Sequence, residues 1–86
     1  MNSIKKALLR KLVYMNKWGG NHTSFDNLHK GFPPHLGKEV KKIAKQLVKE
    51  KLLLSKPTSY GLEVSLNSVK SQEIKTILFS QDTKSL

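Results

Sequence analysis

The sequence predicts a small α+β domain in which three helices form a core, a two-stranded hairpin follows them, and a fourth helix ends the fold. Apolar residues recur at helical spacing over residues 3–18 and again over about residues 35–50. Leu62, Val64 and Leu66 alternate with polar residues, which is typical of a half-buried strand. Amphipathic helices combined with a short alternating strand indicate an α+β fold rather than an all-helical bundle.

The first predicted helix covers residues 3–18. Ile4, Leu8 and Leu12 lie on one face at intervals of four residues. The Gly19-Gly20 pair that follows is expected to end this helix, because glycine adopts the left-handed conformation common after a helix.

A short second helix is predicted over about Ser24–His29, followed by a stiff turn at Phe32–Pro34, because proline fixes φ and bars helix continuation. The third helix is predicted from His35 to about Glu50 and has the clearest periodicity. Its apolar positions are Leu36, Val40, Ile43, Ala44, Leu47 and Val48.

The hairpin is predicted from one strand at Leu52–Leu54, a loop of about six residues at Lys56–Gly61, and a second strand at Leu62–Leu66. A last helix is expected from a cap at Asn67 to about Phe79.

Domain size and the chain end complete the organisation. A chain of 86 residues fits one domain. We expect the domain to span residues 1–79 and residues 80–86 to form a flexible C-terminal tail.

Charge is the strongest compositional signal. The chain has 16 Lys and Arg residues against 6 Asp and Glu residues, a formal net charge of +10. Such a field attracts polyanions, so the expected partner is nucleic acid, an anionic membrane surface or an acidic protein, and a merely solvated lysine-rich surface is the alternative. Arg10 is the only arginine, and lysine suits phosphate contact better than bidentate base reading.

Several functions are disfavoured by what the sequence lacks. It has no cysteine, which removes disulfides and thiol catalysis, and no apolar stretch long enough to span a membrane. His22, His29 and His35 do not share one helical face, so we expect no metal site and no cofactor. The acidic residues are scattered without a nucleophile–base motif, so we expect no enzyme activity. We expect a cytoplasmic protein.

The order of elements resembles the winged helix-turn-helix domain, in which a helical core carries a two-stranded wing. At the residue level, five segments are similar to a group of short archaeal winged-helix proteins of unassigned function. These segments are His22-Thr23, Asn27-Leu28, Lys30-Gly31-Phe32-Pro33, Pro57-Thr58-Ser59-Tyr60-Gly61 and Val64-Ser65-Leu66-Asn67. The resemblance covers about residues 3–79 and implies that the third helix enters a major groove while the wing touches the nucleic-acid backbone.

The third helix carries the candidate binding surface. At about 100° per residue, Lys38, Lys42, Lys45 and Lys49 fall opposite the apolar face. Lys41 lies at one edge of this lysine face and His35 at the other edge. Like charges at these spacings destabilise a helix, so a row of them favours an anionic partner, although a solvated face is the alternative.

Further contacts are expected from the wing and from one turn. Lys56, Thr58 and Ser59 are candidates for phosphate contact. Tyr60 is expected either to stack on a base or to cover the sheet, and Lys30 is expected to contact a phosphate from the turn before the third helix.

The predicted function is binding to nucleic acid, duplex DNA in preference to RNA, with a role in transcription regulation. The alternatives are an RNA- or ribosome-associated protein and a protein-interaction module that meets an acidic partner. Leu9 and Val13 are expected to pack under the last helix or, together with Phe79, to form a homodimer contact.

Overall fold

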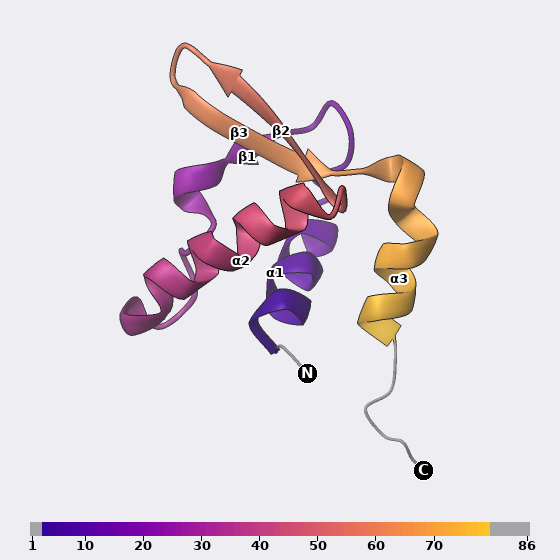
Figure 1. Cartoon of the computed structure of the whole chain (residues 1–86), viewed down its shortest axis with the longest axis horizontal. Coiled ribbons are helices and arrows are strands. Elements are labelled where there is room, and N and C mark those ends of the chain that lie inside the picture. Colours follow the sequence, from indigo (N-terminus) through magenta and orange to yellow (C-terminus); the bar gives the residue numbers. More distant parts are fainter. Residues whose placement is uncertain (1–2, 80–86) are drawn as a thin grey trace.

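The computed structural model describes residues 3–79, which fold into three α-helices and a three-stranded antiparallel sheet (Figure 1). The α+β class predicted from the sequence is therefore confirmed. The elements in chain order are α1 (Ser3–Tyr14), β1 (Thr23–Ser24), a 3-10 turn (Phe25–Asn27), a second 3-10 turn (Pro34–Leu36), α2 (Gly37–Lys49), β2 (Leu53–Thr58), β3 (Gly61–Leu66), a third 3-10 turn (Ser68–Lys70) and α3 (Ser71–Phe79).

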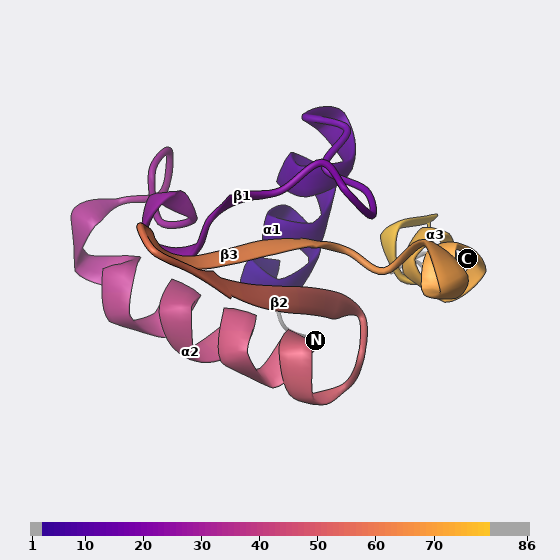
Figure 2. The ribbon, with the colours of Figure 1, turned by 90° about the horizontal axis from the view of Figure 1, so that it is seen from above.

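The sheet has the order β1-β3-β2, so β3 is the central strand. Figure 2 shows α2 beside β2 on one side of the molecule and α1 nearer β1 on the other. The two helices contact each other, and α3 packs against α1 at the far end of the molecule from the hairpin tip (Figure 1). α2 and the hairpin therefore share one side of the fold.

The core lies where the inner faces of α1, α2 and the sheet meet. Leucines at Leu8, Leu9 and Leu12 of α1 are fully buried, and Ile74 is the buried residue of α3. The apolar residues that α2 and β3 add at 0% exposure are Val40, Ala44, Leu47, Val64 and Leu66. Burying each large aliphatic side chain contributes about 1.5–3 kcal/mol, so this one cluster supplies most of the driving force for folding.

The first helix is shorter than the sequence predicts. α1 ends at Tyr14, and the residue that ends it is Asn16, with φ of 58°, rather than Gly19-Gly20. Asparagine tolerates the left-handed conformation because its short side chain adds little steric conflict. Beyond this stop, Trp18 forms a bridge beside Leu66 of β3.

Both long helices end in the same hydrogen-bonding motif. After α1, the Lys17 N–H donates to the Leu12 carbonyl oxygen at 3.0 Å, and after α2 the Leu52 N–H donates to Leu47 at 3.0 Å. In α2 the left-handed residue is Lys51, with φ of 68°. These are Schellman motifs, which satisfy carbonyl groups that a helix end otherwise leaves without partners.

The predicted second helix is a single 3-10 turn at Phe25–Asn27, held by the Ser24 hydroxyl, which accepts from the Asp26 N–H at 3.2 Å.

The third helix starts two residues later than predicted. Residues Pro34–Leu36 form a 3-10 turn, and α2 proper begins at Gly37. Proline at the first position suits this tight turn, because it has no N–H to satisfy.

The predicted six-residue hairpin loop is also wrong. β2 runs to Thr58 and β3 starts at Gly61, which leaves only Ser59 and Tyr60 between the strands. The Thr58 hydroxyl donates to the Gly61 carbonyl oxygen at 2.7 Å and accepts from the Tyr60 N–H at 3.1 Å. Turn composition alone suggested a loop here, whereas these bonds and a φ of 121° at Gly61 close the hairpin tightly.

The last helix broadly follows the prediction. Asn67 accepts from the Val69 N–H at 3.1 Å and so caps the 3-10 turn that leads into α3. The predicted tail over residues 80–86 lies outside the described residues. Within residues 3–79, the helices are all too short and too polar to cross a bilayer.

Candidate nucleic-acid interface

Four lysines form a continuous row on the solvent face of α2. Lys38, Lys42, Lys45 and Lys49 are all exposed, and we call them the α2 lysine stripe. Their spacing follows the helical repeat on the side opposite the buried Val40, Ala44 and Leu47. Among the described residues, no carboxylate lies within ion-pair distance of any of the four. The stripe therefore presents four uncompensated positive charges to solvent.

Glu39 is the acidic residue of α2 itself, and it is exposed in the first turn. Two further acidic residues are engaged at the margins of the helix. The Asp26 carboxylate pairs with the Lys41 ammonium at 3.5 Å, so the charge of Lys41 is partly compensated, unlike the charges of the stripe. Glu50, at the end of α2, pairs with Lys5 of α1 at 3.2 Å and also accepts from the Gln46 side chain at 3.0 Å. The hydrogen bond from Gln46, aided by Lys5, lowers the pKa of the Glu50 carboxyl below its ordinary value.

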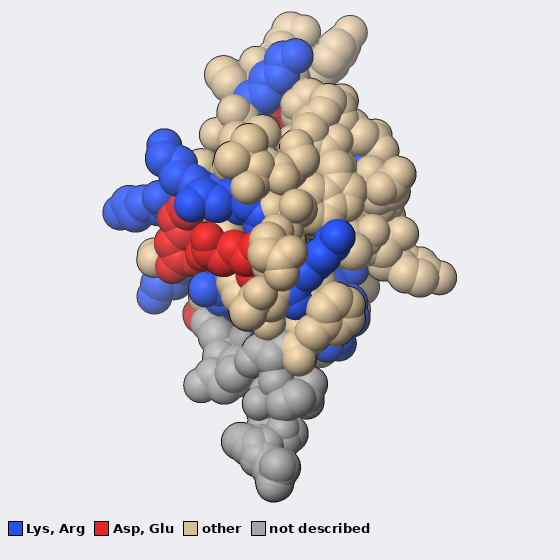
Figure 3. Space-filling view, turned by 90° about the vertical axis from the view of Figure 1, so that its right-hand side faces the viewer, with Lys and Arg blue, Asp and Glu red and all other residues tan. Residues whose placement is uncertain are grey.

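The side of the molecule that carries α3 differs in charge. In Figure 3 acidic and basic side chains touch one another there, and much of the surface is uncharged. Lys70, in the turn before α3, pairs with Glu73 of α3 at 3.7 Å. Positive charge on this side is thus partly neutralised, in contrast to the unpaired stripe on α2.

The hairpin residues predicted to contact phosphate differ in their availability. Lys56 and Ser59 are exposed, whereas the Thr58 hydroxyl makes the two bonds that close the turn. Tyr60 is 96% exposed at the hairpin tip, so it does not cover the sheet. The Tyr60 ring is therefore exposed enough to stack on a base or to contact a nucleic-acid backbone.

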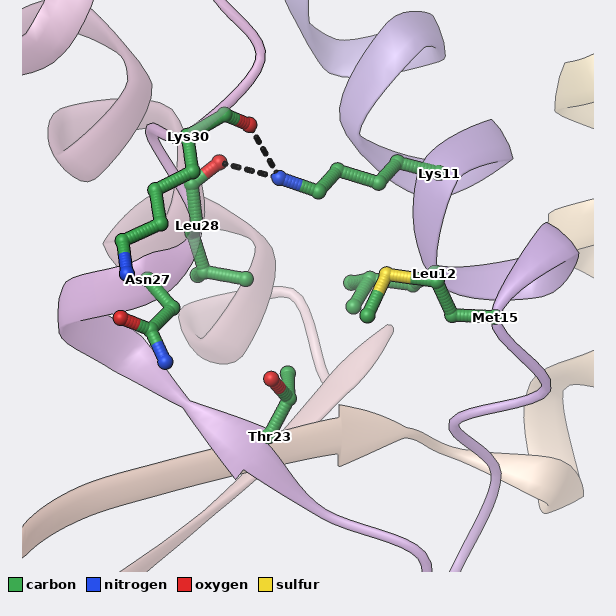
Figure 4. A pocket seen from close by; sticks show the side chains of 7 residues that line it. All are labelled: Lys11, Leu12, Met15, Thr23, Asn27, Leu28 and Lys30. Carbon is green, nitrogen blue, oxygen red and sulfur yellow. Dashed lines mark hydrogen bonds between the residues drawn. The ribbon is translucent and has the colours of Figure 1, made fainter.

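Lys30 lies in an ordered turn rather than on a loose loop. The Lys11 ammonium on α1 donates to the Leu28 carbonyl oxygen at 3.2 Å and to the Lys30 carbonyl oxygen (Figure 4). It also lies 5.8 Å from the centre of the Phe32 ring. Partial burial, and secondarily the charge of Lys30, lowers the pKa of Lys11. These contacts fix the segment that bears the Lys30 side chain.

The Lys11 contact forms one wall of a hollow of about 290 Å³ between α1 and this turn. Leu12, Leu28 and Met15 supply its apolar lining, and the Thr23 and Asn27 side chains lie near its rim (Figure 4). This hollow is on the α1 side and is separate from the α2 lysine stripe.

The histidines do not converge. His35 is exposed in the 3-10 turn before α2, next to the start of the lysine stripe, rather than within the third helix as predicted. His29 is partly buried, and its Nδ1 has no hydrogen-bond partner among the described residues. Within residues 3–79, no group of three or more His, Asp or Glu side chains is arranged to hold a metal ion.

A hollow of about 330 Å³ lies between α2 and the hairpin, and the sequence did not point to it. We call it the α2–hairpin hollow, and it is lined by Phe25, Lys45, Val48, Lys49, Ser55 and Leu62. Lys45 and Lys49 belong to it and to the lysine stripe. Ser55 and Leu62 were missed because the six-residue loop left the strand register undefined. A two-residue turn would have paired Ser55 with Val64 and so placed it on the core-facing side.

Of the three residues expected to form a homodimer contact, two pack in or against the core of the fold. Leu9 is fully buried in the core and cannot contribute to a contact between copies in this fold, and Val13 packs against the same core. Phe79 remains 73% exposed on α3.

The chain matches no model of a known protein family, and no curated protein or solved structure shows significant similarity to it. Its function is therefore inferred from the geometry and chemistry of these residues.

Proposed function

We propose that this chain is a winged-helix protein that binds duplex DNA through α2 and the hairpin. The observation that carries the proposal is the α2 lysine stripe, which has no carboxylate partner among the described residues. Lysines at spacings of three and four residues repel one another, at a cost of a few tenths of a kcal/mol per pair. A polyanion removes that cost and releases its own counterions on binding.

The arrangement of α2 and the hairpin favours duplex DNA as the ligand. The stripe extends about 16 Å along the helix axis, at about 1.5 Å per residue, and an α-helix fits the major groove of DNA. α2 leads through Glu50, Lys51 and Leu52 directly into β2, and the hairpin lies beside the helix. Ser59 and Tyr60 are exposed at the hairpin tip, and Lys56 is exposed on the face of the hairpin opposite Leu62. In the proposed complex these three residues contact the backbone that flanks the groove.

The chemistry favours affinity over sequence selectivity. α2 and the hairpin contain no arginine, so they lack the planar fork that reads guanine through two hydrogen bonds. Lysine contacts to phosphate bind most sequences alike. The proposed role is accordingly transcription regulation or DNA association with weak sequence preference, in the cytoplasm.

The test is a titration of fluorescent random-sequence duplex DNA across a salt series. It compares wild type with the triple variant Lys38→Glu/Lys42→Glu/Lys45→Glu. Each phosphate contact contributes about 0.9 to the slope of log affinity against log salt. The triple variant should bind far more weakly, and its slope should be shallower by about three.

The matched control is Arg10→Glu/Lys17→Glu/Lys75→Glu, which makes the same charge change outside α2 and the hairpin. Both triple variants fall from a formal +10 to +4, because each reversal removes two charges. Circular dichroism checks that both are folded. The proposal fails if wild type does not bind DNA, or if the two variants lose the same affinity and slope.

A further inference from the structure

The α2–hairpin hollow combines an apolar floor with a positive rim, and this combination indicates the kind of group that it accepts. Leu62 is 38% exposed, Val48 is partly buried and Phe25 is largely buried, so these three form a floor that solvent reaches only in part. Lys45 and Lys49 stand at the rim. A ligand that fits has an apolar body with negative charge attached to it.

Ser55 adds hydrogen-bond donors at the same rim. Leu66 of β3 donates to Lys17 and accepts from Gly19, so its backbone groups point away from β2. Backbone groups alternate in direction along a strand, and the register pairs Leu66 with Leu53 and Val64 with Ser55. The Ser55 N–H therefore points to the open edge of the sheet, because β2 is an edge strand.

The open edge is available for an oxygen ligand. Within residues 3–79, neither the Ser55 N–H nor its hydroxyl has a hydrogen-bond partner outside the ladder. Pro57 follows on the same edge and has no N–H, so Ser55 supplies the edge N–H that lies in the hollow with Lys45 and Lys49. Backbone N–H groups and lysines are common ligands of nucleic-acid phosphates.

We propose that the α2–hairpin hollow holds one deoxyribose of a DNA strand, with its flanking phosphates on Lys45, Lys49 and Ser55, and that it thereby selects DNA over RNA. The C2′ carbon of deoxyribose carries only hydrogen and can pack on Leu62 and Val48. A ribose placed there would bring its 2′-hydroxyl against Leu62 and Val48, which offer no hydrogen-bond partner, while the phosphate occupies the donors of Ser55. The volume of about 330 Å³ is at the lower end of small-ligand sites and suits one sugar with its phosphates.

This inference rests on the proposed function and is tested separately from it. The affinities of wild type, Leu62→Ser and Leu54→Ser are measured for a DNA duplex and for the RNA duplex of the same sequence, at equal salt. Leu54 is the matched control because its exposed fraction of 42% is similar to the 38% of Leu62, and because it lies on the opposite face of the sheet. A general effect of A-form geometry applies to all three proteins and cancels in the comparison.

We expect wild type to prefer DNA, and Leu62→Ser to reduce that preference about tenfold, because a hydroxyl in the floor can pair with the 2′-hydroxyl. The salt slope of Leu62→Ser on DNA should match wild type, since the phosphate ligands are retained. Leu54→Ser should leave the DNA-to-RNA ratio unchanged. If wild type binds neither duplex, the proposed function fails. If wild type binds DNA but the two leucine variants behave alike, only the sugar site is wrong.

Methyl NMR gives a second measurement that needs no variant. On addition of a short DNA duplex to labelled wild-type protein, the Leu62 and Val48 methyl signals should shift, and the Leu54 methyl signals should stay in place. Shifts confined to other residues would overturn the assignment of the sugar to this hollow.

Discussion

The Asp26 Oδ1 lies 3.5 Å from the Lys41 Nζ, so an acidic residue from the 3-10 turn after β1 compensates one lysine at the edge of the α2 lysine stripe. Both side chains are well exposed, and the pair itself adds little to stability. Its effect falls on binding, because Asp26 lowers the positive potential beside the stripe and repels an approaching phosphate.

Asp26→Asn should therefore strengthen binding to duplex DNA. The change releases Lys41 for a phosphate contact, which would steepen the salt slope by about 0.9. Salt-dependent titration measures both effects. Glu73→Gln is the control, since it makes the same charge change at an ion pair on α3, and it should leave the slope as in wild type. Equal gains in the two variants would show that net charge alone, rather than Lys41, controls affinity.

Lys11→Met should destabilise the turn that carries Lys30. The change leaves the carbonyl oxygens of Leu28 and Lys30 without the ammonium donor that joins them to α1. Loss of these partly buried contacts should cost about 1 kcal/mol, which lowers Tm by about 4–8 °C in a domain of this size. Lys75→Met, on the exposed face of α3, should leave Tm nearly unchanged. Thermal unfolding by circular dichroism makes the comparison, and similar losses in both variants would contradict the structural role of Lys11.

Lys51→Gly should raise the free energy of unfolding. Lys51 occupies the left-handed region with φ of 68°, where a side chain costs about 1 kcal/mol and glycine adopts the conformation freely. Urea unfolding measures the gain, and Lys51→Ala serves as the control because it removes the same charge without relieving the strain. An alanine variant as stable as the glycine variant would mean that charge, and not backbone conformation, is responsible.

Glu50 should stabilise the fold above its ordinary pKa of about 4.3 and lose that effect in acid. Hydrogen bonds from Gln46 and Lys5 lower the pKa of Glu50 in the folded state, so the folded protein holds its proton less tightly than the unfolded chain. The stability difference between wild type and Glu50→Gln should be constant above about pH 5 and shrink as pH falls through the lowered pKa. The size is below about 1 kcal/mol because the carboxylate is well exposed. A difference that is independent of pH would contradict this coupling.

Local patterns in the sequence were sufficient for the main helices and for the candidate binding face. The periodicity of Val40, Ala44 and Leu47 places the α2 lysine stripe opposite the core without reference to any other part of the chain. Likewise, alternation at Leu62–Leu66 predicts the half-buried strand β3, although its central position in the sheet depends on pairing with β1. Such inferences hold because helix and strand periods decide which side chains share a face.

Tertiary contacts decided the ends and junctions of these elements. The stop of α1 at Asn16 rather than at the glycine pair depends on the bridge between Trp18 and Leu66, which are 48 positions apart. The length of the hairpin turn depends on the strand register, and only that register brings Ser55 and Leu62 to the lysines of α2. The sequence by itself determined which residues are apolar and which face of each element they occupy. The α2–hairpin hollow and the turn held by Lys11 arise only when residues far apart in the chain are packed together, because local propensity carries no information about distant partners.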